Sequence, residues 1–522
     1  MTESVRYGIL PAMHEEPFNL LGVSPDDWAQ SPESVQLALL SLLDIVRAQS
    51  GRLRELETLV RELQAKLGQT SRNSSKPPSS DPPSVPPPPP RPARGRKAGG
   101  QVGHEGHQRP LVPPDQVQDP IELQPQQCPT CQTALLADLP DVAPLRRTQV
   151  WELPPIEPII TEYRQHTVCC PQCRHLVTAE LPADAPPGAC GPRATALMAL
   201  LRGRYRLSLD DVVEFLADVC QLPLGSASIV RGCGRVSEAL APVDAAIQEA
   251  VQTQPQVNVD ETSWPTETRK GWLWVAVSAI AVCFRICTGR GQDELRALLG
   301  DSYRGIVGSD RLSAYKLLPN GQRQLCWSHL VRNLLGLQER YTDESGWAQQ
   351  MLSQTDQLFF AWHAYTDGWF DQVALHQALI PVRVAMQELL RAGVESPYPK
   401  IAGLSRELLA QWEALWTFSR VDGVEPTNNA AERALRPAVL WRKGCFGSRS
   451  AEGCRFVERL LSVRATCAQQ ERALFTFITA AVRAAWAGEQ TPTLIPVPEK
   501  AVSNAQTTTV LRPSAQTTLT WA

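Results

Sequence analysis

Apolar residues recur every three or four positions between residues 34 and 67. They occupy two positions of a seven-residue repeat, and only Gln49 among them is polar: Leu39, Leu42, Val46, Gln49, Leu53, Leu56, Val60, Leu63 and Leu67. This spacing is typical of a coiled coil, in which a polar core residue can fix the register. An amphipathic helix packed on its own domain would show the same spacing. Because a linker follows rather than a partner helix, we expect a leucine zipper over 34–67 that joins copies of the chain into a homo-oligomer.

The apolar pattern stops at Ser71, and up to about Pro114 the chain consists mainly of Pro, Ser, Gly and Arg, with consecutive prolines at 86–90. Such a composition predicts an extended, semi-rigid linker over 71–114 that has no core. Cations in such a linker can neutralise DNA phosphates or simply be solvated, and both interpretations stay open here. The residues concerned are Arg91, Arg94, Arg96 and Lys97.

Two Cys-x-x-Cys pairs come after the linker, Cys128 with Cys131 and Cys170 with Cys173. Four thiolates suit a tetrahedral Zn²⁺ ion in closed, structural coordination, which leaves no open position for catalysis. We therefore predict structural Zn²⁺ at these four residues. Cys169, directly before the second pair, is an alternative ligand.

The segment between the two pairs has to bring the chain back if all four thiolates bind one ion. It contains strand-like pieces at 148–153 and 159–168 that could do so. We predict a zinc-binding domain over 115–190. Most of the other cysteines, such as Cys326, stand singly in apolar segments, as small buried residues do.

Residues 193–250 have the 3.6-residue periodicity of helices, over 194–205, 208–220 and 226–249. A short break at 222–225 ends in Gly and separates the second helix from the third. A helix, a turn and a second helix are compatible with a DNA-binding helix-turn-helix, in which Arg231 would face a groove. Ordinary helical packing explains the same pattern nearly as well.

From Gln256 onward the sequence pattern changes from helical periodicity to β-rich segments. Strands are expected at 257–262, 271–277, 283–286, 305–310 and 324–326, with helices at 293–299, 312–317 and 328–337 between or after them. This order is that of a ribonuclease H-like α/β core. We expect this domain over 255–450, followed by helices over 451–490 and a disordered tail over 491–522.

Asp260 and Asp310 both lie at the ends of predicted strands. A single Asp there is most often a turn residue, but sites in open α/β sheets form at strand ends. Phosphoryl transfer by two hard cations needs several carboxylates at one place. Glu432 is a candidate for the third, because it returns on a helix after a helical insertion, at about 339–416, that is too long to be a loop.

A structural interpretation of Glu432 is also available. With Asn429 as the N-cap residue, Glu432 would complete a capping box, and Glu432 with Arg436 would form a favourable i,i+4 pair. The two interpretations are compatible, since a cap that fixes the first helical turn would also hold the carboxylate in place.

The overall charge is close to balanced, with 51 Lys and Arg against 54 Asp and Glu in 522 residues. A nucleic-acid partner would therefore be met by local basic patches. No run approaches the ~18 uncharged apolar residues that a membrane span needs, and the first residues lack a signal pattern. Together with cysteines suited to thiols or metal ligands, this predicts a cytoplasmic protein without a membrane partner.

A series of short motifs, in this order, resembles the insertion sequence 66 family of bacterial transposases. The matching stretches are Ser71-Arg-Asn-Ser-Ser-Lys-Pro-Pro-Ser-Ser-Asp81, Gly99-Gly-Gln-Val-Gly-His-Glu-Gly106, the two cysteine pairs, Val259-Asp-Glu-Thr262, Ser309-Asp-Arg-Leu-Ser-Ala-Tyr315, Cys326-Trp-Ser-His329, Asn428-Asn-Ala-Ala-Glu-Arg433, Arg442-Lys443 and Phe446-Gly-Ser448. Each motif is short, but their joint order is specific. They cover nearly the full chain.

The resemblance implies a DDE transposase whose ribonuclease H-like core is interrupted by the helical insertion, with Asp260, Asp310 and Glu432 as the catalytic triad. The triad would hold Mg²⁺ or Mn²⁺ and act on transposon ends and target DNA. The resemblance further implies small accessory proteins encoded nearby and a place on the bacterial nucleoid. His329 would be either a proton acceptor near the site or a structural hydrogen-bonding residue.

The helix that carries Glu432 is rich in cations, which we expect beside the scissile strand in contact with phosphates. The residues predicted to bind DNA are Arg231, Asn428, Asn429, Arg433, Arg436, Arg442 and Lys443. The two asparagines could instead orient Glu432. Two other classes of protein remain: a non-catalytic DNA-binding protein derived from a transposase, and a metal-dependent nuclease that cleaves without joining.

Overall fold

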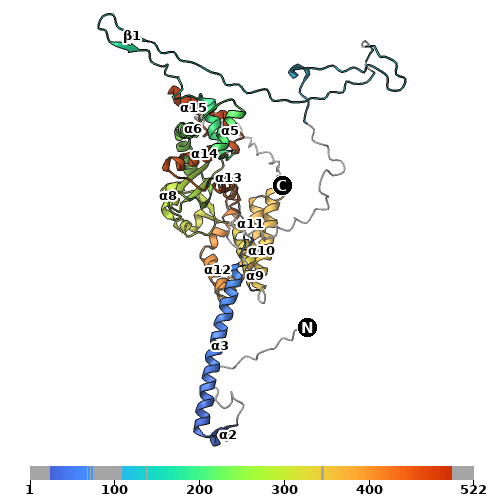
Figure 1. Cartoon of the computed structure of the whole chain (residues 1–522). Coiled ribbons are helices and arrows are strands. Elements are labelled where there is room, and N and C mark those ends of the chain that lie inside the picture. The colour runs from blue at the N-terminus through green and yellow to red at the C-terminus, as the bar shows by residue number, and fades with distance from the viewer. Residues whose placement is uncertain are drawn as a thin grey trace, which may run out of the picture. The chain divides into compact units, whose positions relative to one another are not determined.

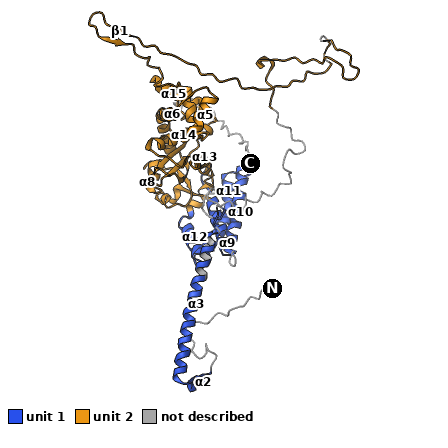
Figure 2. Ribbon diagram, in the orientation of Figure 1, with its two compact units in different colours: residues 1–85, 327–412, 419–422 blue, residues 86–326, 413–418, 423–522 orange. Residues whose placement is uncertain are grey.

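The computed structural model describes residues 24–67, 69–70, 72–73, 109–136, 139–140, 142–267, 269–341 and 346–496 (Figure 1). Most of the predicted linker over 71–114, including its four basic residues, lies outside this part of the chain. The described residues form a mixed helix and sheet protein, as predicted. They divide into two compact units (Figure 2): unit 1 with residues 1–85, 327–412 and 419–422, and unit 2 with residues 86–326, 413–418 and 423–522.

The first described helices of unit 1 are α2 (Pro25–Gln30) and the long helix α3 (Glu33–Leu67). α3 spans the whole predicted zipper as one continuous helix. Apolar side chains of its heptad positions, among them Leu42, Leu53 and Leu63, are exposed on the single chain. This is the kind of apolar stripe that a second helix covers in a coiled coil.

Unit 1 also contains the helical insertion. The helix α9 (Trp327–Arg340) precedes it, and its own helices are α10 (Gly346–Thr366), α11 (Gln372–Val394) and α12 (Pro399–Ala410). α10 and α11 pack through buried side chains such as Leu358 and Leu390, and the indole of Trp347 donates a 2.7 Å hydrogen bond to the Leu389 carbonyl. α9 agrees with the helix predicted at 328–337, and α10, α11 and α12 lie within the segment predicted as a helical insertion, at about 339–416.

The predicted zinc-binding region, in unit 2, has little regular structure. After a short 3₁₀ turn (Pro114–Gln116), its only strands among the described residues are β1 (Thr167–Cys169) and β2 (Leu176–Thr178), which pair antiparallel. The prediction of a strand at 148–153 is wrong. Of the strand predicted at 159–168, only the last two residues belong to β1. Both segments are largely exposed, so they lack the packed face that would stabilise a strand.

Four helices follow, α4 (Pro192–Gly203), α5 (Leu209–Asp218), α6 (Ser226–Ala239) and α7 (Ala241–Thr253). Ser208 caps α5, as expected. The single long helix predicted from 226 to 249 is two helices, because Pro242 lies in the first turn of α7. Proline cannot donate the backbone hydrogen bond that a continuous helix needs there, so the chain restarts at Ala241.

A five-stranded mixed sheet forms the centre of unit 2, in the order β5-β4-β3-β6-β7. Its strands are β3 (Gln256–Ser263), β4 (Trp272–Val277), β5 (Val282–Cys287), β6 (Ile306–Ser309) and β7 (Arg323–Leu325), with α8 (Gln292–Leu299) between β5 and β6. β3, β4 and β5 are antiparallel, and β6 and β7 add to β3 in parallel. All five predicted strands are thus present, while the helix predicted at 312–317 is a 3₁₀ helix (Ser313–Leu317).

Helix α14 (Ala451–Gln469) covers the free edge of β5 with polar side chains. Three amide groups donate across this edge: Val282 to Thr466 Oγ1 (3.0 Å), Phe284 to Ser462 Oγ (2.9 Å) and Ile286 to Glu458 Oε1 (2.6 Å). The acceptors are four residues apart and so lie along one face of the helix. An open edge strand can pair with another chain, and α14 prevents this by satisfying its amide groups.

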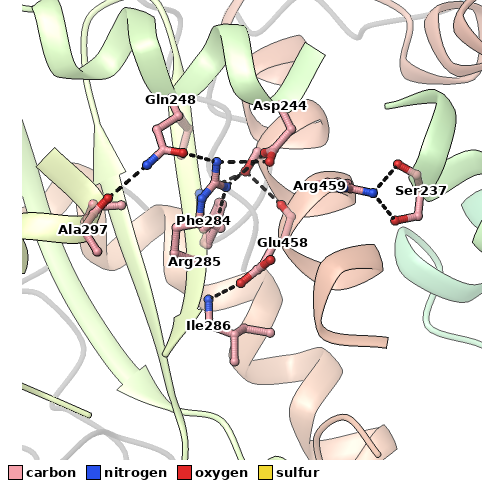
Figure 3. Close-up of polar contacts among 12 residues, drawn as sticks. Ser237, Asp244, Gln248, Phe284, Arg285, Ile286, Ala297, Glu458 and Arg459 are labelled. Carbon is pink, nitrogen blue, oxygen red and sulfur yellow. Dashed lines mark hydrogen bonds and ion pairs between the residues drawn. The ribbon is translucent and has the colours of Figure 1, made fainter. Parts of the chain in front are cut away.

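The same strand is held to α7 by a polar contact in Figure 3. The guanidinium of Arg285 donates to Asp244 (3.1 Å) and to the side chain of Gln248 (2.8 Å). Both partners of this ion pair are largely buried. β5 is therefore fixed on one side by α14 and on another by α7.

The last described helix is α15 (Leu474–Ala487). The predicted disordered tail does not begin at residue 491. Leu494 is buried, and its carbonyl accepts a 2.8 Å hydrogen bond from Gln470. The predicted tail beyond residue 496 lies outside the described residues. Within the described ranges, α15 included, no helix is both long and apolar enough to cross a lipid bilayer.

Candidate functional site

The parallel pairing of β3 with β6 sets the positions of the first two candidate acids. Asn258 is the partner of Gly308, and the same register continued by two residues brings Asp260 level with Asp310. Gly308 suits this pairing, because a side chain there would overlap the side-chain oxygen of Asn258 unless Asn258 moved. Asp260 lies in the second half of β3 and Asp310 directly follows β6. Both carboxylates therefore belong to the ends of adjacent parallel strands, where α/β sheets form sites.

Helix α13 (Asn429–Cys445) carries Glu432 and is attached to β3 at both of its ends. At its start, Asn428 Nδ2 donates a 2.8 Å hydrogen bond to the carbonyl of Val259. At its other end, the guanidinium of Arg442 donates to the Ser263 carbonyl, to Ser263 Oγ (2.6 Å) and to Thr262 Oγ1 (3.1 Å). These bonds hold the helix along the strand that carries Asp260.

Glu432 is in the first turn of α13, but the predicted capping box is wrong. The N-cap residue is Asn428, one position earlier than expected, and its side chain makes no capping bond. Its amide is bound to β3 instead, and the side chain is fully buried. Glu432 therefore does not form the predicted capping box, which would have given it a purely structural role.

Asp260 lies in an acidic environment. Its removal from water raises the pKa of Asp260 well above its ordinary value, and the negative charges of Glu261, Asp310 and Glu432 raise it further, against the lowering effect of a hydrogen bond from the Glu261 amide. The carboxylates are therefore close enough to repel one another. A hard divalent cation bound by carboxylate oxygens would relieve this repulsion, so the donor set fits Mg²⁺ or Mn²⁺.

Cys326 connects the end of β6, beside these acids, with the start of α13. Its amide donates to the Ser309 carbonyl (2.9 Å), next to Asp310, and its sulfur accepts a hydrogen bond from the Asn428 amide (3.2 Å). The sulfur lies within 4.8 Å of a carboxylate oxygen of Glu432. Cys326 is buried, as expected of an isolated cysteine, but it also contacts the start of α13. His329 lies in the first turn of α9, in unit 1.

Glu261 was not singled out from the sequence, yet its side chain is fully buried beside Asp260. Its carboxylate accepts two hydrogen bonds from Arg290 (2.8 and 2.5 Å) and one from the hydroxyl of Tyr315 (2.7 Å). Burial raises the pKa of Glu261, as does the charge of Asp310. The only sequence signal was its place next to Asp260 in a strand whose alternate residues point to the other face.

The residues predicted to contact DNA fall into two groups. Arg433, Arg436 and Lys443 are exposed on α13, Asn429 is half-buried at its start, and Arg231 is exposed on α6, where it donates to Ser228 Oγ (3.2 Å). Asn428 is fully buried and Arg442 is half-buried with its donors directed at β3. These last two side chains hold the helix, so the structure does not present them to a DNA strand.

Each cysteine pair forms the same backbone turn. The Cys128 amide donates to the Thr133 carbonyl, and the Gln132 amide donates back to Cys128; Cys170, His175 and Arg174 repeat this pattern. Gln132 and Arg174 both adopt left-handed backbone conformations. A hydrogen bond from Thr133 lowers the pKa of Cys131 to about 7, and backbone donors around Cys173 lower that of Cys170. Within the described residues the four sulfur atoms are not brought together in one cluster.

The mixed sheet and the carboxylates at the ends of its parallel strands define an α/β protein with a candidate cation site. Residues 187–455 match the model of the transposase IS66 family, so the chain belongs to this family of transposases. Residues 30–110 match a family of unknown function, DUF6444.

A relative from Sinorhizobium fredii (strain NBRC 101917 / NGR234), the uncharacterized protein y4qI, is 29% identical over 262 residues. The match covers 42% of this chain and 46% of the relative. The chain therefore spans about half the length of the curated relative it matches.

Proposed function

We propose that this chain is a DDE transposase that cleaves and joins DNA at a site formed by Asp260, Asp310 and Glu432. The observation that carries the proposal is the convergence of the three carboxylates from β3, the end of β6 and the first turn of α13, expressed in their mutual repulsion. Membership of the transposase family supports it. The strand order, with three antiparallel strands and two added in parallel, supports a ribonuclease H-like core.

Asp260, Asp310 and Glu432 would hold two Mg²⁺ or Mn²⁺ ions, which when bound activate the attacking oxygen and stabilise the leaving oxygen. The reaction would be hydrolysis at the transposon ends followed by attack of the freed 3′-hydroxyl on target DNA. Both are in-line displacements without a covalent enzyme intermediate. The three carboxylates orient the reacting phosphate, and Asn428 and Arg442 keep α13, and with it Glu432, against β3.

Exposed cations of α13 would bind the scissile strand. Arg433, Arg436 and Lys443 are spaced so that they lie along one side of the helix, and their contacts with phosphates would position the DNA without selecting its sequence. Arg231 and Asn429 remain candidates for DNA contact. We assign Asn428 and Arg442 to orienting the helix instead.

The remaining modules would bring two DNA ends together. α3 would pair with α3 of a second copy through its exposed heptad leucines, giving the zipper. The two cysteine turns would share one structural Zn²⁺ through Cys128, Cys131, Cys170 and Cys173, since both turns have the same hydrogen-bond pattern and lowered thiol pKa values favour thiolates. Partner DNA and accessory proteins would complete the complex.

The test is a strand-transfer assay with the full-length chain, Mg²⁺ and duplexes that carry the sequences flanking its gene. Wild type is compared with Glu432→Gln and with Glu238→Gln, an exposed glutamate on α6 that serves as the matched control. We expect joined products from wild type and the control, and none from Glu432→Gln with folding and DNA binding retained. Joined products from Glu432→Gln at the wild-type rate would contradict the triad, and cleavage without joining in wild type would favour the nuclease.

A further inference from the structure

Arg464 of α14 is a cation that has no partner in the described part of the chain. Its side chain is half-buried, yet no hydrogen bond or ion pair of Arg464 occurs among the described residues. Burial lowers the pKa of Arg464, and the positive charges of Arg204 and Arg206 lower it further, to about 10. Partly buried charges are normally paired within the protein, so Arg464, with two exposed arginines near enough to repel it, calls for an anion from outside.

The position of the two neighbours follows from how α4 packs on α14. Gly203 ends α4, and a side chain there would overlap Leu460 of α14. Leu460 and Arg464 are one helical turn apart on the same face. Close packing of the two helices therefore places the loop after Gly203 near Arg464. This loop contains Arg204, Tyr205 and Arg206.

The backbone of this loop favours glycine where the sequence has arginine. The Leu207 amide donates to the Leu201 carbonyl, which closes the end of α4, and Arg206 adopts a left-handed conformation with φ of 65°. Glycine is the residue that such a helix end usually has, because a side chain makes this conformation costly. An arginine at this place is therefore unfavourable for folding.

Cations near the last turn of a helix interact favourably with its free carbonyl groups, and this explains Arg204 without any ligand. It does not explain Arg464, which belongs to a different helix and is repelled by both neighbours. Tyr205 between the two loop arginines is 57% exposed and is in cation–π contact with Arg204, so the loop presents an aromatic ring together with its charges. Cations next to an exposed aromatic ring are typical of nucleic-acid contacts.

We propose that Arg204, Arg206 and Arg464 form a second DNA-contact surface, which binds backbone phosphates through the junction of α4 and α14. This surface lies on other elements than the cations of α13, and it rests on the proposed function because its ligand is the DNA on which the chain acts. Contacts to phosphates do not depend on base sequence or on a divalent cation. The surface therefore binds DNA of any sequence in the presence of a chelator.

The experiment measures binding of the full-length chain to a duplex of arbitrary sequence, with a chelator present, over a series of salt concentrations. The variants are Arg206→Gly and Arg464→Met, and the control is Arg455→Ala, an exposed arginine of the same helix that is paired with Glu452. Each lost phosphate contact should reduce the slope of log affinity against log salt by about 0.9. Arg206→Gly should leave the melting temperature unchanged or raise it, which separates lost contact from lost folding.

The result that supports the surface is a reduced slope in both variants and the wild-type slope in the control. Wild-type slopes in Arg206→Gly and Arg464→Met overturn the surface while leaving the triad to be judged by Glu432→Gln. A slope reduced equally in Arg455→Ala also overturns it, because the effect would then report net charge alone. If the wild-type chain does not bind duplex DNA at all, the proposed function fails together with this surface.

Discussion

The side-chain amide of Asn428 is bound to the carbonyl of Val259, the residue directly before Asp260, at 2.8 Å. Asn428 is also the N-cap residue of the helix that carries Glu432, and its own amide donates to Cys326. One buried asparagine therefore ties together the strand of the first acid, the end of β7 and the helix of the third acid. The spacing between Asp260 and Glu432 depends on this side chain.

Replacement of Asn428 by alanine should reduce strand transfer strongly and lower the free energy of unfolding by about 1–3 kcal/mol, because the Val259 carbonyl would be left buried without its donor. Gln357→Ala is the control, since it removes an amide side chain that is exposed on α10. Denaturant unfolding and the strand-transfer assay measure the two effects. An Asn428→Ala protein with wild-type stability and rate would contradict the assignment of Asn428 as a positioning residue.

Asp260 should make the stability of the metal-free protein depend on pH. Its pKa in the folded chain is raised, so the folded chain keeps a proton that the unfolded chain releases, and stability is lost as the pH rises from the ordinary pKa of an aspartate through the raised value. Asp260→Asn should weaken this dependence, part of which remains because the pKa of Glu261 is raised too. In a chelator at neutral pH it should unfold a few degrees above wild type, since about 1 kcal/mol shifts the melting temperature by roughly 2–4 °C.

Added Mg²⁺ provides the second readout for Asp260. It should raise the melting temperature of wild type, where it relieves the repulsion between carboxylates, and have little effect on Asp260→Asn. Asp293→Asn removes a carboxylate that is 92% exposed on α8 and should behave as wild type. Equal responses to Mg²⁺ in wild type and Asp260→Asn would argue against a cation at this residue.

Glu261 should influence the site through its charge and Tyr315 only through its hydroxyl. The charge of Glu261 raises the pKa of Asp260. Glu261→Gln should therefore lower the acid limit of Mg²⁺ binding, which is the lowest pH at which the ion still binds. Tyr315→Phe removes one hydrogen bond to Glu261 but no charge and should cost about 1 kcal/mol without this shift. Mg²⁺ titrations by calorimetry over a pH series distinguish the two, and an unshifted limit in Glu261→Gln would leave Glu261 with a structural role only.

The sequence indicated the strands and the two strand-end acids because both depend on short stretches of chain. Alternating or continuous apolar residues predicted β3 and β6, and acids at their ends predicted where ligands could gather. Glu261 was missed because its importance comes from Arg290 and Tyr315, which reach it only through the fold. The cap of α13 was misplaced by one residue because Asn428 is used for a bond to β3, a tertiary contact that local capping patterns do not contain.

Ser462 should be more important for stability than a surface serine. Its hydroxyl accepts from the Phe284 amide at the edge of the sheet, so Ser462→Ala leaves a buried donor without a partner and should cost about 1–3 kcal/mol. Arg455→Ala changes an exposed residue of the same helix and should stay within about 0.5 kcal/mol of wild type. Equal unfolding midpoints for Ser462→Ala and wild type would mean that β5 does not need α14 to satisfy its edge.

The two cysteine turns should bind one Zn²⁺ per chain when the full-length protein is prepared without chelators. Cys131→Ser and Cys173→Ser should each abolish stoichiometric zinc, because four thiolates are needed to close a tetrahedral site. Cys169→Ser is the matched control, since Cys169 is exposed beside Cys170 and its sulfur faces the carbonyl of Arg174. Metal analysis by mass spectrometry measures the content. Zinc that is lost in Cys169→Ser but kept in Cys173→Ser would mean that Cys169, and not Cys173, is a ligand. Zinc absent from the wild-type protein would mean that this region binds no zinc.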